Sequence, residues 1–181
     1  MSEIGLALFM ICAAACAAGS NADPRAPQRD SGAAIYTLTA APVTIRIELD
    51  DAMRDALTRR LEARTLDVAR LILRDVRPDG ARALKGVRLF LEKPDADLST
   101  PIDDPHYAGS FVPGFAPPET VQLNIAPALA SVWAARDLSR TALNDRKAIR
   151  ITLVADPWEP ARRMPPEFAL TIQAVALEVP R

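Results

Sequence analysis

Alternation of apolar and polar residues is the dominant pattern of this chain from about residue 35 onward. Apolar residues occupy every second position from Val43 to Leu49, which predicts a strand with one buried face. The run 77–80 (RPDG) predicts a turn, because proline fixes φ and glycine accepts a positive φ. Further runs of strand type follow along the chain, at about residues 66–76, 87–92, 107–112, 121–125, 148–155 and 168–179.

Two segments have a helical period instead. The first covers about residues 50–64, where apolar residues recur every fourth position behind a capping Asp50. The second begins at Pro127, a residue suited to the first helical turn, and carries Leu129 and Val132 on one side. About seven or eight short strands with only two short helices predict an all-β fold, an antiparallel β-sandwich, rather than alternating βαβ units.

The N-terminal part of the sequence differs from the rest. An apolar run over residues 4–18 is too short to span a bilayer, and small residues follow it, so residues 1–22 are predicted to be a signal peptide. Cys16 follows three alanines and is a candidate lipidation site of the bacterial lipoprotein type. Residues 23–34 are small, polar and proline-bearing, and are expected to form a flexible linker before a β-sandwich domain over 35–181. We therefore expect an exported protein that is periplasmic, envelope-associated or secreted, with membrane contact only through a lipid anchor.

Composition narrows the function classes. With 49% hydrophobic and 25% charged residues, the chain falls in the range of folded globular domains. Loss of residues 1–22 would remove one acid, Glu3, and no base, leaving 22 basic and 22 acidic residues, so nucleic acid is not an expected partner. Both cysteines lie in that segment, which leaves the mature chain without thiolates for catalysis, disulfides or zinc.

Candidate catalytic chemistry is sparse. His106 is the only histidine, so the chain alone cannot build a histidine-rich copper or zinc site, and no nucleophile-elbow sequence is present. We expect His106 to fix its loop by hydrogen bonds. The four aspartates of 95–104 leave calcium as an alternative, although their spacing is not that of an EF-hand loop. We expect no cofactor, no metal and no catalytic residue, and hence no enzyme.

The segment from Gly86 to Phe111 combines an apolar strand, a Lys-Pro-Asp loop, the element Asp104-Pro105-His106-Tyr107 and a strand that contains Gly109. In that order these features resemble the β-sandwich domain that follows the catalytic domain in bacterial tyrosinases and plant polyphenol oxidases. Val43–Leu49 and the strand-type run 71–76 resemble the opening strands of that domain, so the likeness extends over most of residues 42–179.

The resemblance implies a domain that packs over a dicopper site, to shield it or to help it mature, whereas this sequence, with one histidine, is not expected to contain the six-histidine catalytic domain. The first hypothesis is thus a non-catalytic exported accessory domain that docks on a separately encoded tyrosinase-like or other copper oxidase. The alternative is a free-standing, envelope-associated binding or structural module without an oxidase partner. Phe115, on a loop stiffened by prolines, and Trp158 are the candidate partner contacts.

Overall fold

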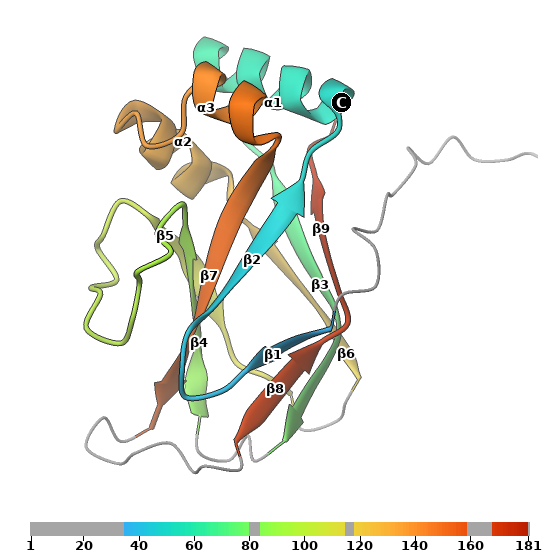
Figure 1. Cartoon of the computed structure of the whole chain (residues 1–181), viewed down its shortest axis with the longest axis vertical. Coiled ribbons are helices and arrows are strands. Elements are labelled where there is room, and N and C mark those ends of the chain that lie inside the picture. The colour runs from blue at the N-terminus through green and yellow to red at the C-terminus, as the bar shows by residue number, and fades with distance from the viewer. Residues whose placement is uncertain (1–34, 80–83, 115–117, 159–167, 181) are drawn as a thin grey trace, which may run out of the picture.

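The computed structural model describes residues 35–79, 84–114, 118–158 and 168–180. These residues form two antiparallel sheets packed face to face, with three short helices at one end (Figure 1). The predicted all-β sandwich is therefore confirmed. The predicted signal peptide, Cys16 and the linker 23–34 lie outside the described residues.

Nine strands build the two sheets of the described part. The five-stranded sheet contains β1 (Tyr36–Leu38), β8 (Ala169–Ile172), β3 (Arg70–Asp79), β6 (Glu119–Asn124) and β9 (Ala174–Glu178). The four-stranded sheet has the order β2 (Val43–Glu48), β7 (Ala148–Pro157), β4 (Leu84–Leu91) and β5 (Tyr107–Phe111). The helices are α1 (Asp51–Ala63), α2 (Ala126–Ala134) and α3 (Arg140–Arg146).

Local sequence explains the first helix and the strand before it. In β2 the apolar Ile45 and Ile47 are buried while their polar neighbours are exposed. The carboxylate of Asp50 accepts a hydrogen bond of 2.8 Å from the backbone nitrogen of Met53 and caps the start of α1. The helix ends at Arg64, whose φ of 55° lies in the left-handed region. Both predicted elements are thus present.

The course of β3 corrects the predicted turn at 77–80. The strand continues to Asp79, and Pro78 pairs with Leu170 of β8, so described residues 77–79 are strand. A bulge between Leu73 and Val76, with Asp75 at a φ of 52°, interrupts the pairing of β3 with β6. The first half of β3 pairs with β9 and its second half with β8, which splits the single strand predicted over 168–179 into two.

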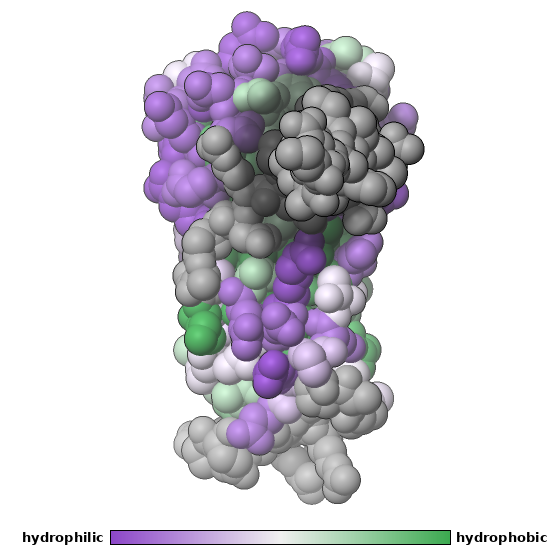
Figure 2. Space-filling model, turned by 90° about the vertical axis from the view of Figure 1, so that its right-hand side faces the viewer, coloured by the Kyte–Doolittle hydropathy of each residue, from purple (hydrophilic) through white to green (hydrophobic). Residues whose placement is uncertain are grey.

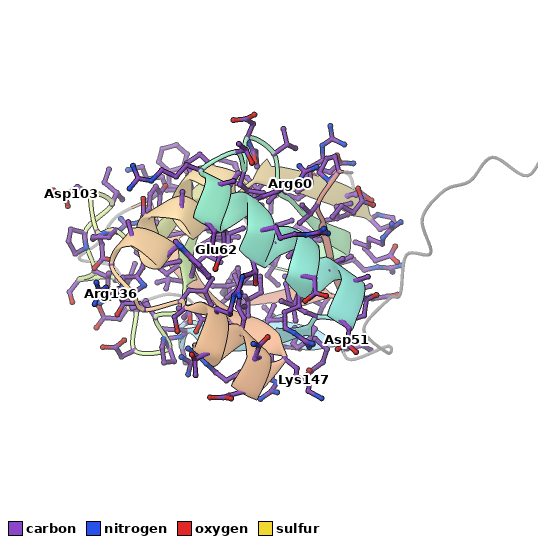
Figure 3. The ribbon with its side chains drawn as sticks, turned by 90° about the horizontal axis from the view of Figure 1, so that it is seen from above. Asp51, Arg60, Glu62, Asp103, Arg136 and Lys147 are labelled. Carbon is purple, nitrogen blue, oxygen red and sulfur yellow. The ribbon has the colours of Figure 1, made fainter. Side chains whose placement is uncertain are left out.

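The third helix is the other difference from the sequence prediction. Ser139 caps α3 by accepting a hydrogen bond of 3.2 Å from the backbone nitrogen of Ala142. Only Leu143 of this seven-residue helix is buried. Figure 3 shows the three helices lying side by side over the end of the sandwich, and in Figure 2 this end is mostly hydrophilic. In the described residues no helix has the length and apolar character needed to cross a membrane.

Candidate functional site

Loop 93–106 leads from β4 to β5 and carries Asp104, Pro105 and His106, while Tyr107, the last residue of the Asp104–Tyr107 element, begins β5. It lies against the outer face of the four-stranded sheet, where Ala96 packs with Phe90 of β4 and Val154 of β7 in a second, smaller core. Tyr107 closes this core through an edge-to-face contact with Phe90, with ring centroids 5.6 Å apart. The loop is therefore built into the sandwich.

His106 ties the end of this loop to two other parts of the fold. Its Nδ1 lies 2.7 Å from the carbonyl oxygen of Leu91, and its Nε2 lies 3.3 Å from a carboxylate oxygen of Asp137, between α2 and α3. Its backbone nitrogen donates to Asp104 over 2.8 Å, and Asp104 in turn pairs with Lys93 at 3.4 Å. Because a carbonyl only accepts, Nδ1 carries the hydrogen, and both ring nitrogens face protein oxygens.

Glu92, directly before the loop, is a buried carboxylate that the sequence analysis did not single out. Its side chain is 1% exposed. It accepts hydrogen bonds from Nη1 of Arg146, from Nε and Nη2 of Arg150 and from the backbone nitrogen of Arg150. Arg146 also donates to the carbonyl of Asp137, at 3.3 Å. One charged network thus joins β4, β7 and the connection between α2 and α3.

Asp97 shapes the middle of the loop. The hydrogen bonds from the side chain and backbone of Ser99, with weaker ones from Thr100, hold the pKa of its carboxyl below the ordinary value of 3.8. The calcium alternative gains no support, since the described residues contain no group of three or more His, Cys, Asp or Glu that could hold a metal ion.

Exposed large apolar side chains gather around the same loop. The described residues contain five of them, Ile35, Leu98, Ile102, Val112 and Trp158. Two belong to the loop itself, one directly follows β5 and one directly follows β7. In Figure 1, β4, β5 and the loop form the left side of the molecule, with the end of β7 below them. We call the outer side of β4, β5 and β7, together with loop 93–106, the loop face.

Strand register explains how these residues come together. Gly86 pairs with Asp156 of β7, and the side chain of Val112 lies beside it, 3.9 Å from where a β-carbon on Gly86 would be. Two positions further along β4, Arg88 forms an ion pair of 2.9 Å with the same Asp156. Arg88 also donates a hydrogen bond of 3.4 Å to the carbonyl oxygen of Leu98. The loop residue Leu98 is thereby joined to the row that contains Val112.

The candidate contact Trp158 directly follows the end of β7 and is 65% exposed. Phe115, the other candidate contact, lies outside the described residues. Gly109 has a φ of +126° and pairs with Leu89, so it belongs to the same structural unit as the Asp104–Tyr107 element. Pro105 of that element is exposed.

A hollow of about 350 Å³ is present at the helical end, between α1 and α3. Its lining is polar, and consists of Asp55, Thr58, Arg59, Arg140 and Asn144. Figure 3 shows Glu62 of α1 on the side toward α3, where it pairs with Arg140 at 2.7 Å. The hollow is therefore bordered by an exposed ion pair.

No family model and no curated protein sequence matches the chain. Among solved structures it is similar to a recombinant latent aurone synthase, a polyphenol oxidase, at 16% identity and a TM-score of 0.46, over 78% of this chain and 25% of that one. A latent apple tyrosinase is 15% identical with a TM-score of 0.45, and the match covers 80% of this chain and 27% of the tyrosinase. A latent aurone synthase co-crystallised with hexatungstotellurate(VI) and soaked in H2O2 is 18% identical with a TM-score of 0.49. That match covers 86% of this chain and 30% of the synthase.

These neighbours are enzymes, but the chain spans only 25–30% of their length. At such low sequence identity, the likeness concerns the fold alone. The activity and partners of the whole enzymes are therefore not transferred to this chain by the comparison.

Proposed function

We propose that this chain is a non-catalytic accessory domain that docks on a separately encoded copper oxidase of the tyrosinase type. The sequence from Gly86 to Phe111, which resembles the domain that follows the tyrosinase catalytic domain, forms one compact unit of β4, loop 93–106 and β5. The unit is fixed on the inside by Phe90 and Tyr107, and by the contacts of His106. Its outer side is left available for a partner.

The observation that carries the proposal is the position of the exposed apolar residues. Three of the five large ones in the described residues, Leu98, Ile102 and Val112, lie on the loop face, while Ile35 precedes β1 and Trp158 follows β7. Exposed apolar patches of this kind are typical of protein interaction surfaces. A non-catalytic role is further supported by His106, since both nitrogens of the single imidazole are already directed at Leu91 and Asp137.

A binding and inhibition assay tests the proposal. The purified chain is titrated into the catalytic domain of a tyrosinase-type oxidase of the source organism, freed of any C-terminal domain of its own. We expect saturable binding by calorimetry and a matching decrease in the rate of catechol oxidation. Val112→Ser should weaken both, whereas Ile35→Ser, a change at a similarly exposed residue (67% against 65%), should not. Absence of binding together with unchanged oxidation would contradict the proposal.

The second candidate function is a free-standing binding module, and the hollow between α1 and α3 favours it. Arg59 and Arg140 contribute two guanidinium groups to a lining that also contains Asp55, and Arg140 is paired with Glu62, so a small anionic ligand would compete with these carboxylates. Titration with citrate and with inorganic phosphate, followed by nuclear magnetic resonance, tests this function. Saturable shifts at Thr58 and Asn144 are expected, and their absence with both anions would remove the support.

A further inference from the structure

We propose that the loop face binds a protein surface in which positive charge surrounds an apolar centre. This inference rests on the proposed function for the identity of the partner, and adds which face binds and what chemistry it recognises. Its starting point is that the exposed apolar residues of the loop face are accompanied by an excess of one charge.

The charge excess comes from loop 93–106, which contains four aspartates and one lysine. Lys93 is already paired with Asp104. Asp95 and Asp103 are exposed and make no hydrogen bond or ion pair within the described residues, and Figure 3 shows Asp103 at the periphery of the molecule. The guanidinium of Arg88, which reaches the carbonyl of Leu98 in this loop, is paired with Asp156. The loop therefore presents uncompensated negative charge beside Leu98 and Ile102.

The exposed residues are held on a stiff support. Arg88 fixes the carbonyl of Leu98, the carboxylate of Asp97 fixes Ser99 and Thr100, and His106 fixes the end of the loop. A loop with this many internal bonds loses little conformational entropy when a partner covers it. Binding by this face therefore does not depend on prior ordering of the loop.

Negative charge also decides between two kinds of partner. If a second copy of this chain covered the loop face symmetrically, the two acidic loops would meet, and facing charges of the same sign oppose association. A cationic surface is attracted over a distance of about 10 Å at 0.1 M salt, where screening sets in. The charge therefore favours a basic partner over self-association.

The first arm of the test uses the oxidase catalytic domain described above. Ile102→Ser should weaken its binding about tenfold, as expected for an apolar anchor, and Ile35→Ser should not. Asp103→Asn should weaken it about two- to fivefold at low salt and less at high salt, because rim charges act through screened attraction. Asp145→Asn, which removes an exposed carboxylate from α3, is the matched charge control and should leave the affinity unchanged.

The second arm does not depend on the oxidase. Two amphipathic peptides are used as probes, one of alternating leucine and arginine and one in which glutamate replaces arginine. We expect the arginine peptide to shift the amide resonances of Leu98, Ile102 and Val112, and the glutamate peptide to leave them unchanged. If the oxidase does not bind but the arginine peptide shifts these three resonances, the proposed function is wrong. The inference that the loop face binds a basic, apolar surface is then still supported. Equal response to both peptides, or shifts confined to the helical end, would overturn the inference even if the oxidase binds.

Discussion

The buried carboxylate of Glu92 provides the sharpest test of how the loop face is supported. Glu92→Gln keeps the size of the side chain, removes its charge and replaces one acceptor oxygen with a donor that faces other donors. The carboxylate accepts four hydrogen bonds, three of them from the guanidinium groups of Arg146 and Arg150. We therefore expect the substitution to destabilise the whole domain.

The magnitude follows from the exposure of the partners. Removal of one member of a buried ion pair costs about 3 to 5 kcal/mol when the other charge stays buried. The side chains of Arg146 and Arg150 are 31% and 39% exposed, so water compensates part of the loss, and we expect about 2 to 3 kcal/mol. For a domain of this size that corresponds to a decrease in melting temperature of about 5 to 10 °C.

Thermal and urea unfolding measure the effect, and Glu62→Gln is the matched control. Glu62 also pairs with an arginine, at 2.7 Å, but the two side chains are 44% and 60% exposed. An exposed pair contributes less than about 1 kcal/mol to the free energy of unfolding. Equal destabilisation by the two substitutions would refute the argument that burial makes Glu92 important.

Three further predictions concern the loop and the strand after it. The hydrogen bonds that lower the pKa of Asp97 stabilise the fold at pH values above the ordinary pKa of 3.8. The native protein should therefore be more stable than Asp97→Asn at neutral pH, and thermal melts at acid pH should show this difference disappearing as the pH falls through the lowered pKa. Gly109→Ala should cost about 1 to 3 kcal/mol in urea unfolding because of the positive φ, and Ser110→Ala should have almost no effect. His106→Ala should cost about 1 to 3 kcal/mol, because the carbonyl of Leu91 loses its donor. Copper-dependent catechol oxidation that disappears in His106→Ala would contradict this structural role.

Elements with strong local signals could be predicted from the sequence. The alternation from Val43 to Leu49 defines β2, and Asp50 with the following fourfold period defines α1. The short α3 was missed because it buries only Leu143 and so has no apolar stripe. The continuation of β3 through Pro78 was missed because a proline before aspartate and glycine is a turn signal, and only pairing with β8 makes it a strand.

The candidate site was predictable in part. The order of residues from Gly86 to Phe111 drew attention to the correct loop, because these residues are close in sequence. The partners of Glu92 are 54 and 58 residues away, at Arg146 and Arg150, so no local pattern reveals that this glutamate is buried. The placement of Val112 and Asp156 on either side of Gly86 likewise depends on the register of three strands, which the sequence does not specify.

Hydrogen exchange of the chain in the presence of the oxidase catalytic domain tests the central claim most directly. The account predicts slower exchange in residues 95–103 and in the end of β5, with helices α1 and α3 unchanged. Slower exchange in the helices with no change in residues 95–103, or no change anywhere at saturating oxidase, would contradict it.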